Sequence, residues 1–289
     1  MVQPAMDAGP MQLRCGRHSL SLDIPVVMGV LNVTPDSFSD GGRFAGLPAA
    51  LAQAERMAGE GAAIIDVGGE STRPGATPVS VDEELRRVVP VIERLVERLD
   101  LPVSVDTSKP EVMRAAIAAG ASMVNDVTAL RAAGAIKALA HSDVAICLMH
   151  MQGEPRTMQR EPRYTDVLVE VRDFLRGRVA CCMDAGIAVS RLVIDPGFGF
   201  GKSLEHNLEL LRRLSELAAD GHPVMAGLSR KSMIARLTGH ADGERLAGSL
   251  ALATLALLAG AKIIRAHDVG PTVDAIRVVS AMGERLGGA

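Results

Sequence analysis

Cationic side chains follow several of the apolar runs in this sequence. They are Arg73, Arg230, Lys231, Arg265 and His267, in a chain of 289 residues with a formal net charge of −3. Guanidinium groups bind phosphate oxygens through paired hydrogen bonds. Any one of these residues, taken alone, could instead form an ordinary surface ion pair. Their repetition favours a binding site for an anionic small molecule.

Carboxylate and amide side chains form a second set. Asp106, Asn125 and Asp195 each stand at or just beyond the end of a short apolar run. Together they offer acceptors and donors that match the edge of a nitrogen heterocycle. Asp and Asn also favour helix N-caps and turns, so turn formation is the competing interpretation, above all for Asp195 before Pro196 and Gly197.

Aromatic residues are scarce, with five Phe, one Tyr and no Trp. Phe38, Phe44, Phe198 and Phe200 lie in Gly-rich segments, and only Phe174 lies on a helical pattern. We therefore expect the four loop phenylalanines to lie outside the core. They either anchor their loops or stack on a flat ring, and the sequence leaves both possibilities open.

The segment PGFGFGKS, residues 196–203, partly resembles a phosphate-binding P-loop because it follows a strand-like run and ends in Gly-Lys-Ser. A P-loop requires Gly where this segment has Pro196, and the spacing G-x-G-x-x-G is absent as well. We therefore expect no nucleotide P-loop. The histidines form no H-x-x-x-H pair, but a diphosphate could recruit Mg²⁺ with few protein ligands. Asn32 and the aspartates of the loop after it are close enough to assist.

The elements that must position these residues are eight apolar, β-branched runs with helical patterns between them. The runs are continuous rather than alternating, as in parallel strands buried on both faces. Together with the lack of any linker, this pattern favours a single α/β domain over residues 1–289, a (β/α)8 TIM barrel, over an open sheet. We expect strands at 26–33, 63–67, 103–105, 122–127, 144–149, 192–194, 224–228 and 262–266, and helices at 47–58, 81–99, 110–119, 134–140, 165–185, 203–218, 230–237 with 244–258, and 271–283.

Several local signals refine this barrel. The spacings Ser80/Glu83 and Ser108/Glu111 indicate capping boxes at two helix starts. Residues 11–22 are expected to form a hairpin around Gly16 that caps the N-terminal end of the barrel, and residues 1–10 to be flexible. In a barrel of this type the functional residues lie at the C-terminal ends of the strands. The polar residues described above follow nearly every strand at that end.

Composition excludes several classes of protein. Basic residues are dispersed, which argues against a nucleic-acid partner. The most apolar run, residues 246–260, is shorter than the ~20 residues that span a bilayer, so we expect a buried or subunit-interface helix and no membrane partner. The four cysteines show no C-x-x-C spacing, and the N-terminus lacks a secretory signal. A cytoplasmic location with reduced thiols is the simplest expectation.

The motifs MGVLNVTPDSFSDGG, DVGGESTRPG, VSVDTSKPEV, VNDV, LMHMQG, DPGFGFGK, GLSRKS and RAHDV occur in this order from residue 28 to residue 269. Through them the chain resembles the bacterial dihydropteroate synthase family. Members join 6-hydroxymethyl-7,8-dihydropterin diphosphate to p-aminobenzoate, release pyrophosphate, are inhibited by sulfonamides and are usually dimers. No motif position departs from the family pattern, and the resemblance implies this reaction, Mg²⁺ and a homodimer through the helix at 246–260.

The resemblance also implies residue roles. Asp106, Asn125, Asp195, Lys231 and Phe200 would bind the pterin, which moves Lys231 away from the phosphate role suggested by its charge. The diphosphate would be bound by Asn32, Arg73, Arg265 and His267, with Asn32 toward the metal. The p-aminobenzoate site would comprise Phe38, Thr72, Arg73, Pro74, Ser229 and Arg230, and the catalytic set would be Asp40, Arg73, Lys231, Arg265 and His267.

The long polar loop 32–44 then becomes a lid whose Asp40 and Phe38 make contacts only when it is closed. Departure of diphosphate would leave a pterin methylene cation, which the aniline amine attacks, so no strong general base is needed. Three alternatives remain. They are a methyltetrahydrofolate module of a corrinoid methyltransferase, a catalytically silent pterin-binding protein, and a barrel enzyme acting on another phosphorylated metabolite. STRPG, SRKS and R-x-H argue against the first.

Overall fold

The structure is a computed structural model that describes residues 10–34, 42–71, 77–154, 157–239 and 244–286. Eight parallel strands form one sheet in the order β8-β7-β6-β5-β4-β3-β10-β9. A parallel bridge between Ile194 and Val224, with Ile194 N donating to Pro223 O at 3.0 Å, brings the two ends of the sheet together. The predicted (β/α)8 barrel is confirmed. The strands are β3 (Val26–Asn32), β4 (Ile64–Gly68), β5 (Val103–Asp106), β6 (Met123–Asp126), β7 (Ala145–Met149), β8 (Leu192–Asp195), β9 (Met225–Ala226) and β10 (Ile263–Ala266).

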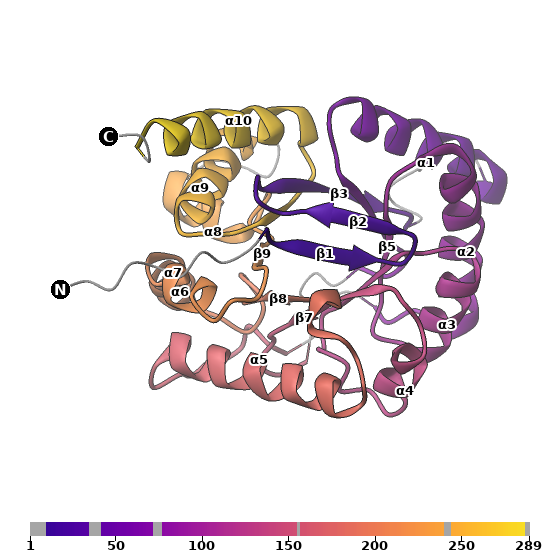
Figure 1. Ribbon diagram of the computed structural model, residues 1–289, viewed down its shortest axis with the longest axis horizontal. Helices are drawn as coiled ribbons and strands as arrows, with labels where there is room; N and C mark the ends of the chain where they lie inside the picture. Colours follow the sequence, from indigo (N-terminus) through magenta and orange to yellow (C-terminus); the bar gives the residue numbers. More distant parts are fainter. Residues whose placement is uncertain (1–9, 35–41, 72–76, 155–156, 240–243, 287–289) are drawn as a thin grey trace.

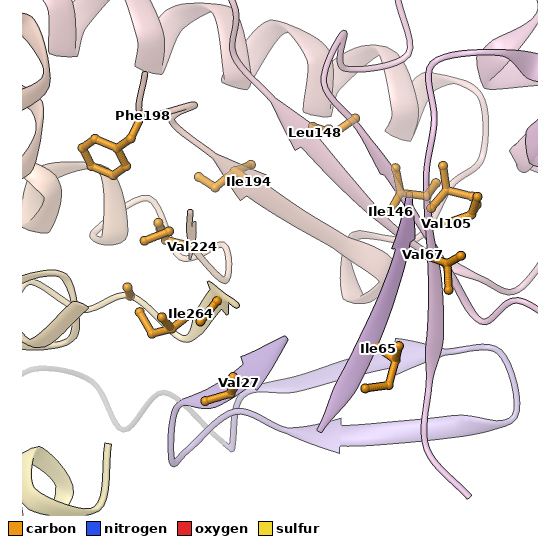
Figure 2. Packing of buried hydrophobic residues seen from close by; sticks show 14 of the residues in the cluster. Val27, Ile65, Val67, Val105, Ile146, Leu148, Ile194, Phe198, Val224 and Ile264 are labelled. Carbon is orange, nitrogen blue, oxygen red and sulfur yellow. The ribbon is translucent and has the colours of Figure 1, made fainter. Parts of the chain in front are cut away.

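Helices surround the strands as a ring (Figure 1). The strand residues that point outward, such as Val67 and Val105, form one large apolar cluster with residues of the helices. The helices therefore cover the outer face of the sheet. Figure 2 shows part of this cluster, with Val27, Ile65 and Ile264 among its members. The helices are α1 (Gly42–Gly59), α2 (Val81–Arg98), α3 (Pro110–Ala118), α4 (Ala135–Ala140), α5 (Val167–Asp184), α6 (Leu204–Arg212), α7 (Leu214–Ala218), α8 (Ser232–Thr238), α9 (Leu246–Leu258) and α10 (Val269–Leu286).

Some helix boundaries differ from the expected ones. α1 begins at Gly42 rather than at residue 47 and includes Pro48. The expected helix at 203–218 is two helices, because Arg213 between them has non-helical dihedral angles, φ −105 and ψ 14. Ser80 caps α2 by accepting a hydrogen bond from Glu83 N, as predicted.

The Ser108 capping box is wrong, because Pro110 occupies the first turn of α3 and Lys109 is its N-cap residue. A capping box does occur at Ser203, where His206 takes the place of the usual Glu or Gln. That substitution explains why the spacing rule missed it.

An N-terminal hairpin caps one end of the barrel, as expected. It consists of β1 (Gln12–Cys15) and β2 (His18–Ser21), antiparallel and joined at Gly16, whose φ is +57. Figure 1 shows the hairpin across the centre of the ring of helices. Its buried side chains pack on the lowest inward residues of the strands. This second apolar cluster contains Leu13, Cys15, Leu22, Met28, Ile64, Met123, Ala145, Cys147, Val193, Met225 and Ile263.

The loop after β8 corrects the expectation that the loop phenylalanines lie outside the core. Phe198 is 1% exposed and Phe200 8% exposed. Gly197, with φ +68, approaches the loop after β7 so closely that a Cβ would lie 1.9 Å from His150 O. Because the glycines let this loop fold down onto its neighbour, both phenylalanines are pressed against the barrel.

Further expectations concerned membrane helices, the cysteines, the extent of the domain and the cellular location. The described residues contain no helix long and apolar enough to cross a membrane. Cys15, Cys147 and Cys182 are buried and Cys181 is exposed, all as free thiols. The extent of the domain and the cytoplasmic location stay predictions. Residues 1–9 lie outside the described residues.

Candidate functional site

Polar side chains replace apolar ones inside the barrel toward the C-terminal ends of the strands. Alternate residues of a strand point to the same face, so each strand contributes a lower and an upper inward residue. The lower residue joins the apolar layer on the hairpin in most strands, and the upper one is polar. The pairs are Ile64 and Asp66, Ser104 and Asp106, Met123 and Asn125, Val193 and Asp195, and Ile263 and Arg265.

Four of these upper residues, Asp106, Asn125, Asp195 and Arg265, line a pocket. Five of the residues expected at the pterin site lie in its wall, together with Arg265. The sequence prediction therefore brought together side chains from four strands and two loops. The wall consists of Asp106, Asn125, Val127, Met149, Asp195, Gly197, Phe198, Phe200, Gly227, Lys231 and Arg265.

Arg265 bridges two carboxylates. Its Nε donates to Asp66 Oδ2 at 2.7 Å and its Nη2 donates to Asp106 Oδ2 at 2.8 Å. Burial opposes the charge on Arg265, but the two carboxylates outweigh it and raise the pKa of the guanidinium. Burial raises the pKa of Asp106 to about 7, although Arg265 acts in the opposite direction. The guanidinium is therefore a fixed cation whose plane is held on two sides.

Asp195 and Lys231 lie on the other side of the pocket. Asp195 Oδ1 accepts a hydrogen bond from Gly197 N at 2.6 Å, and burial raises the pKa of this carboxyl. Burial lowers the pKa of Lys231 to about 8, with Arg265 acting in the same direction. The ammonium lies 4.1 Å from the centroid of the Phe200 ring, which is a cation–π contact. This contact explains how Phe200 enters the site while remaining nearly buried.

Asp66 is a site residue that the sequence analysis missed. It is fully buried on β4, and its Oδ2 accepts from Asn125 Nδ2 at 3.1 Å as well as from Arg265. The signal in the sequence was an aspartate inside the apolar run at 63–67. Such a residue is costly to bury unless it is paired, so it marks a polar network.

Ser229, Arg230 and His267 meet above β9 and β10. Ser229 Oγ lies 3.0 Å from His267 Nδ1 and accepts from His267 N at 3.2 Å, which favours donation by the hydroxyl to Nδ1. Burial, reinforced by Arg265, lowers the pKa of His267 to about 4. His267 is therefore a neutral imidazole near pH 7, and its inclusion among the cations is corrected. Arg230 pairs with Asp268 through two hydrogen bonds of 3.1 and 2.6 Å.

The remaining predicted residues lie at the mouth of the barrel or outside the described residues. Asn32 ends β3 beside Gly68, with which it pairs in register. Its Oδ1 lies 3.6 Å from the place where a Cβ on Gly68 would stand. Among the described residues, no three His, Cys, Asp or Glu side chains gather in a way that could hold a metal. Phe38, Asp40, Thr72, Arg73 and Pro74 lie outside the described residues.

The position of Lys202 shows whether the segment 196–203 could act as a P-loop. It is 2% exposed and lies beneath the loop after β8. Its Nζ donates to Gly197 O and Phe200 O, each at 3.0 Å, and lies 2.9 Å from His150 Nδ1. A P-loop lysine must reach a nucleotide phosphate, whereas this one donates to two backbone carbonyls of its own protein and lies against a third polar group. The expectation of no P-loop is therefore supported by geometry.

Known proteins resemble this chain over nearly its whole length. The model of the family described as pterin binding enzyme matches residues 28–267. The dihydropteroate synthase of Escherichia coli strain K12 is 53% identical over 271 residues, which is 94% of this chain and 96% of the relative. The Xanthomonas albilineans dihydropteroate synthase, solved with 4-aminobenzoic acid, is 54% identical with a TM-score of 0.90, and the match covers 95% of this chain and 99% of that one. The Burkholderia cenocepacia dihydropteroate synthase complexed with 7,8-dihydropteroate is 48% identical with a TM-score of 0.88, covering 97% and 99%.

Proposed function

We infer the function from the family, because the chain belongs to the pterin-binding enzymes and, among them, to the dihydropteroate synthases. The protein condenses 6-hydroxymethyl-7,8-dihydropterin diphosphate with p-aminobenzoate to 7,8-dihydropteroate and pyrophosphate. One structural observation supports this function in addition to sequence similarity. It is the pocket, whose wall contains Asp106, Asn125, Asp195 and Lys231 from separate strands and loops. Those are the side chains that the motifs assign to the pterin.

The pterin ring would bind among these four side chains. Asp195 and Asp106 offer carboxylate acceptors to ring N–H and amino groups, and Lys231 offers a donor to a ring carbonyl or nitrogen. Phe200 packs against Lys231 and completes an apolar wall for the flat ring. A flat ring with both donors and acceptors on one edge can pair with this set of carboxylates, amide oxygen and ammonium.

The diphosphate would lie above the pterin, toward Arg265, His267 and Asn32, with Arg73 approaching from the second loop. Arg265 supplies a permanent cation at the edge of the pocket. His267 is neutral, so it would contribute a hydrogen bond rather than charge. A donor set of two arginines and two neutral polar groups favours a leaving group whose charge is shared with a metal.

Mg²⁺ fits this end of the site. Asn32 presents a hard amide oxygen at the end of β3, and Mg²⁺ commonly takes one or two protein ligands with the remainder from phosphate and water. Asn32 would hold the ion together with the diphosphate. When bound, Mg²⁺ would neutralise part of the diphosphate charge.

The p-aminobenzoate would bind over Ser229 and Arg230. Arg230 has φ +57, and its backbone N donates to Ser249 Oγ at 3.0 Å, so the turn that carries both residues is fixed from beneath. The Asp268 pair holds the Arg230 guanidinium near the rim, where a carboxylate could approach it. Phe38, Thr72, Arg73 and Pro74 would complete this site from the two loops.

The reaction requires the protein to neutralise the leaving diphosphate, to exclude water from the site and to orient the amine. Arg265 and Lys231 provide the buried positive charge, and Asp40 and Arg73 belong to the loops that would close the site. The amine loses its proton after the carbon–nitrogen bond forms, so a strong base is unnecessary. The neutral His267 agrees with that requirement, because its Nδ1 lies at the Ser229 hydroxyl and, among the described residues, forms no hydrogen bond with a carboxylate.

The test is product formation from the two substrates with Mg²⁺. Dihydropteroate detected by mass spectrometry, dependent on p-aminobenzoate and lost on addition of EDTA, is the expected result. Methyl transfer from 5-methyltetrahydrofolate to a corrinoid, with no dihydropteroate, would instead establish the methyltransferase module. Pterin binding without either product would establish the silent binder.

We also propose a homodimer through α9. Its buried face includes Leu252, Ala253 and Ala256, which pack onto the barrel. The opposite side leaves Leu255 52% exposed and Leu258 62% exposed. Two large exposed leucines on one short helix favour burial against another copy of the chain.

A further inference from the structure

Asp66 lies behind the pocket rather than in its wall. It is fully buried at the middle of β4, level with Val30 on β3 and Ser104 on β5. It is absent from the residues that line the pocket. A carboxylate at such a position is costly to bury without partners. Its partners therefore indicate why it is there.

One oxygen of Asp66 joins two distant strands. Oδ2 accepts from Arg265 Nε at 2.7 Å and from Asn125 Nδ2 at 3.1 Å. In the sheet order, β10 lies two strands from β4 on one side and β6 lies two strands away on the other. Both donors belong to the pocket wall. Asp66 therefore sets the position of two wall residues across five strands of the barrel.

The contact also fixes the orientation of the Asn125 amide. An ionised carboxylate only accepts hydrogen bonds, so the amide must turn its NH2 toward Asp66 and its oxygen away. Asn125 Oδ1 is buried and has no protein partner within the described residues. The amide thus offers an acceptor at the pocket wall, which an N–H group of a bound heterocycle would satisfy.

Arg265 is held in the same way. Asp66 takes its Nε–H and Asp106 takes one hydrogen of Nη2, which fixes the plane of the guanidinium. Without Asp66, Arg265 could rotate about its pair with Asp106. The direction in which its other N–H groups point would then no longer be set.

We propose that Asp66 is a positioning residue that holds the Asn125 amide and the Arg265 guanidinium, and so sets the donor and acceptor pattern presented to the pterin diphosphate. This inference rests on the proposed function. Replacement of Asp66 should therefore weaken pterin binding more than it lowers the stability of the fold. The effect should be small for the second substrate, because the hydrogen-bond partners of Asp66 in the described structure are Asn125 and Arg265, and not Ser229 or Arg230.

The experiment compares Asp66→Asn with Ser104→Ala. Ser104 is a matched control, because it is fully buried, pairs in register with Asp66 and has an Oγ without a partner in the described structure. For Asp66→Asn we expect the KM for the pterin diphosphate to rise at least tenfold, while the KM for p-aminobenzoate stays within twofold. Ser104→Ala should keep both within twofold of the unaltered enzyme.

A rescue variant separates positioning from general packing. Asn125→Asp alone places two carboxylates against each other and should weaken pterin binding more than Asn125→Ala does. Combining Asn125→Asp with Asp66→Asn restores one amide and one carboxylate between the two positions. The new carboxylate at 125 still offers an oxygen to the pocket. The combination should recover at least tenfold of the affinity lost in Asn125→Asp.

Three results would overturn the inference. They are equal KM changes for both substrates in Asp66→Asn, strictly additive losses in the combined variant, and pterin binding by Asn125→Asp as tight as by Asn125→Ala. If Asp66→Asn does not fold, the comparison of pterin binding by Asn125→Asp and Asn125→Ala still tests the inference. Absence of dihydropteroate with the unaltered enzyme would contradict the proposed function instead, so the two failures are distinguishable.

Discussion

Arg265 Nη2 donates to Asp106 Oδ2 at 2.8 Å, which joins a side chain expected at the diphosphate to one expected at the pterin. The two residues stand on β10 and β5, three strands apart in the sheet order. A single guanidinium therefore couples the two halves of one substrate. It also stabilises a buried carboxylate whose pKa burial raises to about 7.

Replacement of Arg265 should test this coupling. Arg265→Ala removes two charge-assisted hydrogen bonds, each contributing about 1.5–3 kcal/mol, and deprives both Asp66 and Asp106 of their guanidinium partner. We expect kcat/KM for the pterin diphosphate to fall at least ~100-fold, since about 1.4 kcal/mol corresponds to a factor of ten. Arg265→Lys should remain at least ~10-fold impaired, because an ammonium lacks the planar fork that bridges two carboxylates. Steady-state kinetics near the unaltered values would contradict the assigned role.

The pH dependence of kcat/KM for the pterin diphosphate should be bell-shaped. The acidic limb should lie near pH 7, because Asp106 must be ionised to accept ligand N–H groups and burial raises its pKa to about 7. Activity should fall again above about pH 8, where Lys231 loses its proton because burial has lowered its pKa. These two values belong to a coupled set of groups. Lys231→Arg keeps its charge, so its alkaline limb should disappear, whereas an unchanged limb would exclude Lys231 as its source.

Two glycines offer a matched pair for the loop after β8. Gly197→Ala would place a Cβ 1.9 Å from His150 O at a position with φ +68, so the loop must move. Gly177 lies within α5 with no atom near its missing Cβ. Gly177→Ala should stabilise the protein by about 0.5–1 kcal/mol, because alanine favours the helix. Thermal unfolding should show opposite shifts, and pterin binding should be lost only in Gly197→Ala.

The homodimer prediction concerns the exposed side of α9. Leu255→Glu combined with Leu258→Glu should give a monomer in sedimentation experiments, because two charges would be buried at the proposed interface. Met183→Glu is the control, since Met183 is 51% exposed and lies on α5. A dimer that survives the α9 substitutions would place the interface elsewhere.

Local patterns in the sequence predicted the barrel because continuous apolar runs require burial on both faces. They also predicted that Asp106, Asn125 and Asp195 lie together, since the C-terminal ends of parallel strands meet at one end of a barrel. The role of Asp66 could not be predicted, because its partners stand 59 and 199 residues away in the chain. Phe198 was wrongly expected to lie outside the core, because it stands in a Gly-rich segment. Those glycines in fact allow the loop to pack inward.

The ratio of pyrophosphate to dihydropteroate tests the central claim most directly. The purified protein is incubated with 6-hydroxymethyl-7,8-dihydropterin diphosphate and Mg²⁺, with and without p-aminobenzoate, and both products are quantified. The account predicts one pyrophosphate for each dihydropteroate when p-aminobenzoate is present. Pyrophosphate release that never yields dihydropteroate, or no release at all from a folded, pterin-binding protein, would contradict it.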